Sequence, residues 1–329
     1  MSLIMESILK EQKISTRRER LKTMARRLED AYDKMLSRVK AQDNIKEKIG
    51  MAALMWVSHS ERPLKLDELR YALAVEIGSV DFDLENAPSK KTLSDCCQGL
   101  LAVDEASTVR LAHSTLRHYL SEHPDFVDRA HSAMAETCLT YLNFRQFKSP
   151  LTSELPDLIQ TPFLGYSSIY WGAHARRNLS DSAKSLALNL FNDYGDHISV
   201  KLLLKHVLDP DDFSNIEGFS SFTGLHCASF FGIVGIVAAL MGVDGCDVEQ
   251  MDCVGNTPLM WAARNGHERA VELLRGLGDI TPNLPCRSNQ ALPLHDKRKR
   301  VEELPPQDPP PKAAPGDLGS KRHKPPCDL

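Results

Sequence analysis

The chain has 329 residues, 42% of them hydrophobic and 26% charged, which fits about two domains with soluble cores. The formal net charge of −4 is uneven: residues 1–48 carry +5, residues 281–329 carry +3, and residues 49–280 carry −12. Because phosphate binding needs a clustered positive field, the acidic middle argues against a broad nucleic-acid surface there.

Apolar run length, the pattern of the first residues and cysteine spacing bear on where the protein is found. No apolar run reaches the roughly 18 residues that span a bilayer, and the first residues do not have the pattern of a secretory signal. The eight cysteines form no CxxC pair, so we expect free thiols, no metal site and no cofactor. These features predict a cytoplasmic protein that does not enter a membrane.

The first part of the chain has helical periodicity. Apolar side chains recur every three or four residues over 16–40, and a second helix continues through Trp56. A third helix should begin near Asp67 and stop at Gly78, and a fourth should span about 91–98.

A β-hairpin should follow the fourth helix. Two short apolar strands, 100–103 and 108–111, flank a four-residue polar turn, and another helix begins directly afterwards. Helix–helix–hairpin–helix within about 60 residues is the arrangement of a winged helix. We therefore predict a helical lead-in at residues 1–58 and a winged helix at residues 59–122.

An internal repeat lies in residues 209–280. The run TGLHCA at Thr223 is matched by TPLMWA at Thr257, and the same offset of 34 separates Gly232 from Gly266. A period near 33 with this motif is the signature of ankyrin repeats.

The sequence between these two modules reads as helical. Residues 123–208 are predicted to form a helical connector, with a proline-interrupted loop at 148–162. Since about three repeats are needed for a stable stack, we expect the helices within 182–208 to act as a degenerate N-terminal cap on two repeats.

The last stretch changes composition. Eleven of the 19 prolines lie in residues 282–329, so we predict a disordered Pro-rich basic tail over 281–329. The cluster Lys297-Arg-Lys-Arg300 is either a nuclear-import signal or ordinary solubilising charge. The fold class expected for the whole chain is mainly α: a winged helix with a small hairpin, a helical connector, a short ankyrin solenoid and this tail.

Three stretches resemble the C-terminal half of fungal NACHT–ankyrin NOD-like receptors. They are Arg27–Leu36 with Trp56 and Arg62–Leu69; Cys97–Asp104 with Val109–Leu120; and Phe163–Arg176. That family binds ATP through a P-loop, GxxxxGK[ST], which this sequence lacks. The resemblance therefore implies the back half of such a receptor without its NTPase core, as a fragment, a truncated gene model or a stand-alone remnant. We expect no enzymatic activity.

His113 is the ionisable residue that the resemblance singles out. In NOD-like receptors the matching winged-helix histidine lies beside the ADP phosphate, so the resemblance implies cofactor binding at His113 if an NTPase domain is supplied. The alternative is a structural histidine that caps the following helix and packs against the wing.

The ankyrin repeats are the predicted partner-binding surface. Side chains that vary in such repeats lie at the turn tips and on the inner helices; here these are Asp252, Cys253, Val254, Trp261, Arg264 and Asn265. An exposed Trp261 with Arg264 one turn away would be a typical interaction hot spot. The competing interpretation is that Trp261 packs between repeats.

Two further functions stay open. One is a winged-helix nucleic-acid binder, although the candidate recognition helix over 91–98 contains Asp95 and follows several acidic residues. The other is a regulatory subunit that completes a NACHT NTPase in trans.

Overall fold

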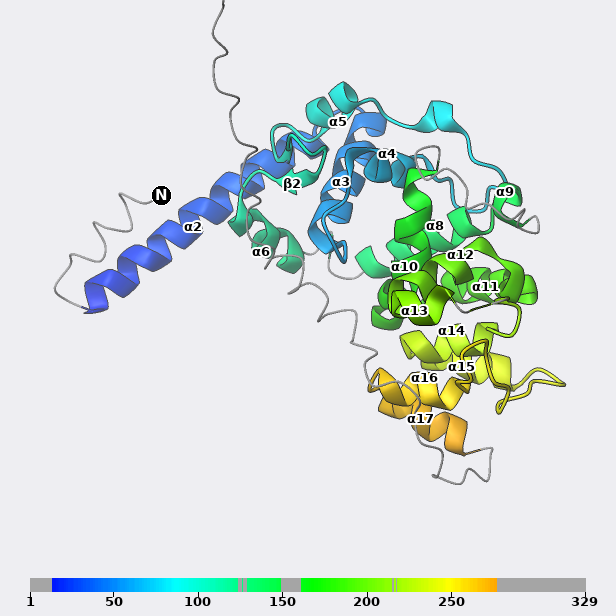
Figure 1. Cartoon of the computed structure of the whole chain (residues 1–329). Helices are drawn as coiled ribbons and strands as arrows, with labels where there is room; N and C mark the ends of the chain where they lie inside the picture. Colours follow the sequence, from blue (N-terminus) through cyan, green and yellow to red (C-terminus); the bar gives the residue numbers. More distant parts are fainter. Residues whose placement is uncertain are drawn as a thin grey trace, which may run out of the picture. The chain divides into compact units, whose positions relative to one another are not determined.

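The computed structural model describes residues 14–123, 126, 129–148, 161–214, 216 and 218–276. This part of the chain is mainly helical, with one two-stranded antiparallel sheet among the described residues (Figure 1). The predicted mainly α class, with a winged helix followed by ankyrin repeats, is confirmed. The tail over 281–329, with Lys297–Arg300, lies outside the described residues.

The predicted lead-in helices are α2 (Ile14–Lys40) and α3 (Asn44–His59). Helix α3 begins at Asp43, whose carboxylate accepts the Lys46 N–H at 3.0 Å. Buried side chains pack the two helices against the last helix of the winged helix; they are Tyr32, Leu36, Val39, Leu54, Leu116 and Leu120.

The winged helix follows with the predicted order of elements. They are α4 (Leu66–Ala74), the 3-10 turn η1 (Leu84–Asn86), α5 (Lys90–Cys96), β1 (Leu101–Val103), β2 (Val109–Leu111) and α6 (Ser114–Glu122). The predicted hairpin is present and antiparallel, with Leu101 opposite Leu111 and Val103 opposite Val109.

The third helix is shorter than predicted. Helix α4 ends at Ala74 and not at Gly78. The Ser79 N–H and hydroxyl both donate to the Glu76 carbonyl, which closes a turn over Glu76–Ser79 that contains Gly78 at positive φ. Phe82 then stacks on Tyr71 with ring centroids 4.8 Å apart, and this contact folds the following loop back onto the helix.

The described residues of the connector and the segment after it form six helices and one 3-10 turn. They are α8 (Ala130–Leu142), α9 (Arg145–Lys148), α10 (Pro162–Arg177), α11 (Asp181–Leu190), η2 (Phe191–Asp196), α12 (Ile198–Val207) and α13 (Pro210–Ser214). Helix α10 is central: it packs on α4, α8, α12 and α14. Trp56 joins it to the lead-in helix α3, with ring contacts to Phe163 and Tyr166 at 5.5 and 5.8 Å.

Two helix pairs complete the described chain. The first repeat holds α14 (Gly224–Phe231) and α15 (Val234–Met241), and the second holds α16 (Pro258–Arg264) and α17 (Glu268–Arg275). Helix α14 packs against both α16 and α10, so the repeats continue directly from the connector (Figure 1). None of the helices that the structure describes has the length and apolar character needed to cross a bilayer.

Gly172 on α10 lies directly against Phe231 of α14. A Cβ atom built there would overlap the ring of Phe231, which itself packs edge-on against Trp171. We expect Gly172→Ala to lower the free energy of unfolding by about 1–3 kcal/mol, because overpacking outweighs the better helix propensity of alanine. Urea unfolding followed by circular dichroism measures this change.

Gly165 provides the matched control on the same helix. Nothing lies within 4 Å of a Cβ atom built there. Gly165→Ala should therefore be neutral or stabilise the protein by about 0.5–1 kcal/mol. Equal effects of the two substitutions would contradict a tight contact between the connector and the first repeat.

Candidate functional site

The repeat motif fixes how the two helix pairs start. Thr223 and Thr257 are the N-cap residues of α14 and α16, and the Thr257 hydroxyl accepts the Met260 N–H at 3.3 Å. Nδ1 of His226 accepts the Thr223 N–H at 3.1 Å, and its Nε2 donates to the Gln250 carbonyl at 3.0 Å. The buried imidazole therefore ties the loop between the repeats to the first repeat.

Asp252 is a structural residue of the turn tip. Its Oδ1 accepts the N–H groups of Val254 and Asn256 at 3.0 and 2.9 Å, while its side chain is almost fully buried. Its Oδ2 accepts the Trp261 indole N–H at 2.6 Å. The carboxylate holds the turn and the next helix together, so the expectation that it faces a partner is wrong.

Trp261 is buried as well. The side chain is 1% exposed, and its ring lies edge-on to Phe222 and Phe230 with centroids 6.0 and 5.6 Å apart. The predicted exposed indole is therefore wrong, and the competing interpretation, that it packs between repeats, describes what the structure shows. Both ring neighbours of Trp261 belong to the first repeat. The helical pattern of the second repeat alone therefore could not show whether the indole faces solvent or the first repeat.

The other four predicted residues are half-buried. The Arg264 guanidinium lies 6.0 Å from the centre of the Trp261 ring, and the Asn265 amide donates to the Trp261 carbonyl at 2.9 Å. Burial raises the pKa of the Cys253 thiol to about 11, so it is protonated near neutral pH. These residues, with Val254, frame the surface; whether they touch a partner stays a prediction.

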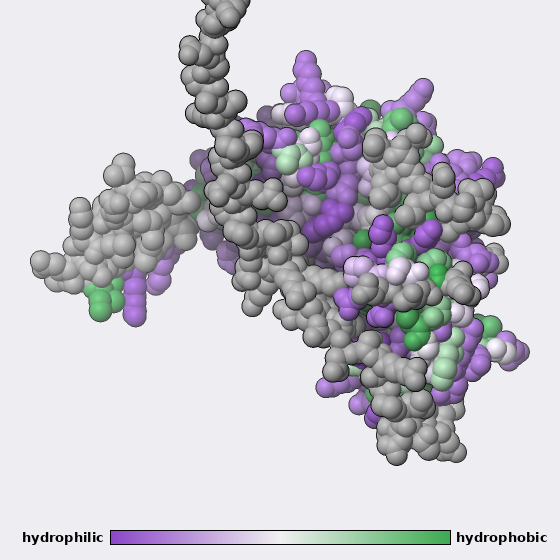
Figure 2. All heavy atoms as spheres, in the orientation of Figure 1, coloured by the Kyte–Doolittle hydropathy of each residue, from purple (hydrophilic) through white to green (hydrophobic). Residues whose placement is uncertain are grey.

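One exposed part of the repeats is the finger loop, which we define as residues 242–251, between α15 and α16 (Figure 1). Val243 and Met251 are 58% and 52% exposed. Three exposed carboxylates lie between them in sequence: Asp244, Asp247 and Glu249. Figure 2 shows hydrophobic and hydrophilic atoms side by side where this finger projects. The signal was available in the sequence as two apolar residues bracketing an acidic run.

The finger loop has its own internal order. The Cys246 N–H donates to the Val243 carbonyl at 3.1 Å, and the Glu249 N–H donates to Asp247 at 3.0 Å. The exposed apolar side chains therefore sit on a hydrogen-bonded backbone. Such a surface offers apolar contact together with negative charge.

His113 lies at the junction of strand and helix, as predicted. It is the N-cap residue of α6, is exposed, and makes no side-chain capping hydrogen bond. His113 thus occupies the capping position of the structural alternative through its backbone and not through its side chain, and contact with a nucleotide stays a prediction. Within the described residues no group of three or more histidine, cysteine or acidic side chains is placed to hold a metal ion.

Comparison with protein families adds two matches. Residues 32–134 match the model described as GPI inositol-deacylase, winged helix domain. Residues 186–286 match ankyrin repeats, in three copies. The chain therefore carries a winged helix domain of the GPI-inositol-deacylase type followed by ankyrin repeats. No solved structure matches it. The predicted domain limits stay predictions; the ankyrin match begins inside the stretch expected to be a degenerate cap.

Proposed function

We propose that this chain is a non-enzymatic protein-interaction module that binds a protein partner through its ankyrin finger loop. Ankyrin repeats make protein–protein interaction the general functional class. The observation that carries the proposal is the ordered finger loop, which exposes Val243 and Met251 beside an acidic run. A partner with an apolar contact surface and basic side chains fits this loop.

The wider proposal is a regulatory role like that of the back half of a NACHT–ankyrin receptor, in the cytoplasm. The order of winged helix, helical connector and repeats supports it. His113 is exposed at the start of α6, where its side chain is accessible to a nucleotide held by a NACHT domain in trans. Co-purification with a NACHT protein, weakened by His113→Ala, would support this role.

Charge on the winged helix favours protein interaction over nucleic-acid binding. Helix α5 exposes Lys90 and Lys91 but also Asp95. The neighbouring loop exposes three more acids, Asp81, Asp83 and Glu85. This mixture lacks the positive field that phosphate backbones require.

Site-specific photocrosslinking in cells, with the reactive amino acid at position 251, tests the proposal. The captured protein is then purified and its affinity for the full chain is measured. We expect Met251→Ala and Val243→Ala each to weaken binding by about tenfold, because each removes apolar area from the contact.

Glu272, exposed on α17 away from the finger loop, provides the control position. Crosslinker at position 272 should not capture the same protein, and Glu272→Ala should leave the affinity unchanged. Equal capture from both positions, or full affinity of both finger-loop variants, would contradict the proposal.

A further inference from the structure

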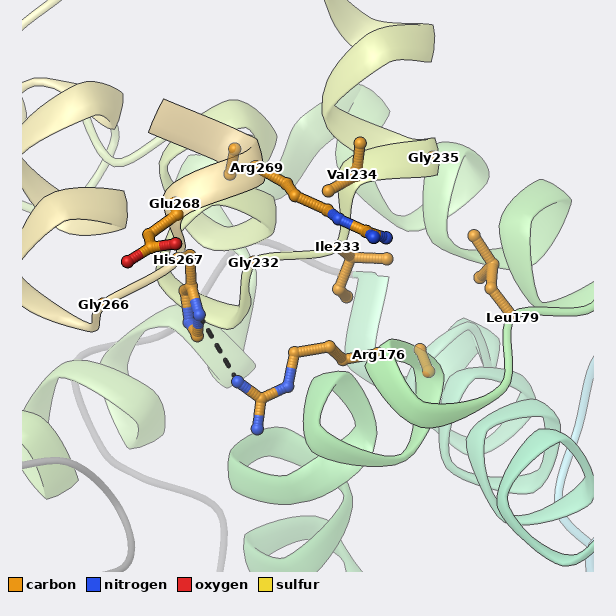
Figure 3. Close-up of a pocket in the computed structure, with 12 residues that line it drawn as sticks. Arg176, Leu179, Gly232, Ile233, Val234, Gly235, Gly266, His267, Glu268 and Arg269 are labelled. Carbon is orange, nitrogen blue, oxygen red and sulfur yellow. Dashed lines mark hydrogen bonds between the residues drawn. The ribbon is translucent and has the colours of Figure 1, made fainter. Parts of the chain in front are cut away.

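A pocket lies at the other end of the helix pairs from the finger loop. It is a cavity of about 410 Å³ between the end of α10 and the turns inside the two repeats (Figure 3). Helix α15 starts at this pocket and ends at the finger loop, while α16 runs in the opposite sense. The two surfaces are therefore separate.

Two guanidinium groups enter the pocket from different elements. Arg176 comes from α10 and Arg269 from α17, and Figure 3 shows the two side chains extending along opposite sides of the pocket, the Arg176 guanidinium group toward His267 and the Arg269 guanidinium group toward Val234. Neither forms an ion pair with a described carboxylate. The Glu268 carboxylate, also in the lining, points away from both guanidinium groups in Figure 3. The hollow therefore has a net positive lining.

His267 fixes the position of Arg176. Its Nε2 donates to the Phe230 carbonyl at 2.9 Å, so Nδ1 is left as an acceptor for Arg176 Nη1 at 3.3 Å. Burial lowers the pKa of His267, and the nearby Arg176 charge lowers it further, so the ring is neutral near pH 7. Only one Arg176 N–H is used in this way, which leaves the others for a ligand.

The rest of the lining is apolar or backbone. Ile233 is 2% exposed and forms the floor with Ala175 and Ala270, which are also buried. The N-cap residues of α15 and α17, Ile233 and His267, make no side-chain capping hydrogen bond. First-turn N–H groups therefore add donors beside the two guanidinium groups.

We propose that this pocket binds an anionic side chain of a protein partner, a carboxylate or a phosphorylated hydroxyl, between Arg176 and Arg269. Guanidinium groups present planar pairs of donors that match carboxylate and phosphate oxygens. The inference goes beyond the finger loop and does not require it: a partner could use either surface alone. It extends the predicted ankyrin surface to the connector helix.

Three labelled peptides test the proposal by fluorescence anisotropy with the full chain. They share a neutral sequence and differ at one position, which is phosphoserine, glutamate or serine. We expect the phosphoserine peptide, the glutamate peptide or both to bind, and the serine peptide to bind at least about tenfold more weakly. Binding of the first alone identifies phosphate as the ligand group; binding of the second identifies carboxylate.

Two substitutions connect binding to the pocket. Arg176→Gln and Arg269→Gln should each weaken binding by about tenfold, and affinity should fall as salt rises from 50 to 300 mM. Arg269 makes no ion pair with a described residue, so Arg269→Gln reports on binding without a loss of folding. Arg275→Gln, an exposed arginine at the end of α17 outside the pocket, is the matched control.

The proposal is overturned if all three peptides bind equally or not at all. It is also overturned if the double variant R176Q/R269Q keeps wild-type affinity. Crosslinking at position 251 is a separate measurement of the finger loop. A negative result in the peptide experiments therefore leaves the finger-loop proposal standing, and a negative crosslinking result leaves the pocket proposal standing.

Discussion

Trp261→Ala is expected to lower the free energy of unfolding by about 3–5 kcal/mol. The substitution empties space between Phe222 and Phe230, and it leaves the buried Asp252 carboxylate without its indole donor. An unpaired buried acceptor adds a desolvation penalty to the lost packing. Urea unfolding of the full chain, followed by circular dichroism, measures the change.

Trp261→Phe separates the two contributions. The phenyl ring keeps much of the contact with Phe222 and Phe230 but cannot donate to Asp252, so we expect an intermediate loss of about 1–3 kcal/mol. Met251→Ala, on the exposed finger loop, should change stability by no more than about 0.5 kcal/mol. A Trp261→Ala protein that is as stable as wild type would contradict the packing role and restore the indole as a candidate for partner contact.

The repeats show what a periodic pattern can predict. The offset of 34 between Thr223 and Thr257 fixed the helix starts, because each threonine is an N-cap residue in the structure. The pattern could not fix the direction of Trp261, since its ring partners lie 31 and 39 residues earlier in the chain. Whether the Trp261 ring faces solvent or the core depends on which repeat packs against its helix.

The winged helix was predictable for local reasons. A polar turn between two short apolar runs specifies a hairpin, and Ser89 marks the start of α5 because its hydroxyl accepts the Thr92 N–H. The end of α4 at Ala74 was missed, and the loop that follows is held by the stacking of Phe82 on Tyr71, a contact that the helical pattern does not specify. Gly78 does have positive φ, but it lies in the loop beyond the helix end.

The seam between the modules could not be read from sequence. Arg177 pairs with Glu61 of the segment between α3 and α4, 116 residues earlier, and the adjacent Arg176 contacts His267, 91 residues later. The last turn of α10 thus contacts both the segment before α4 and the second ankyrin repeat. The arginine-lined pocket exists only because the end of α10 meets the turns at 232–235 and 266–270, so no spacing in the sequence could have indicated it.

A buried histidine in the connector should make stability depend on pH. His197 is 6% exposed and caps α12: its Nδ1 accepts the Ser199 N–H at 3.1 Å and the Ser199 hydroxyl at 2.7 Å, while Nε2 donates to the Leu142 carbonyl. Burial lowers its pKa to about 4; the Leu142 bond opposes this shift and the charge of Lys148 adds to it. Protonation of Nδ1 would break both hydrogen bonds that it accepts.

The direction of the pH effect follows from proton binding. In the unfolded chain His197 has a pKa of about 6.5. Between that pH and pH 4 the unfolded chain therefore binds a proton that folded His197 does not bind. The stabilisation that neutral His197 provides is fully present above about pH 6.5. It is lost as the pH falls, and the loss reaches about 3 kcal/mol by pH 4. Urea unfolding at half-unit steps from pH 7 to 4 measures the slope.

His197→Gln removes this titration while keeping a polar side chain at the helix start. The gap in unfolding free energy between wild type and this variant should narrow by about 3 kcal/mol from pH 7 to pH 4, whatever its size at pH 7. Gly165→Ala, which changes no titratable group, should run parallel to wild type over the same range. Titrating carboxylates are common to all three proteins and cancel in the comparison. Parallel curves for wild type and His197→Gln would show that His197 does not stay neutral in the folded connector, and that another group causes any acid sensitivity.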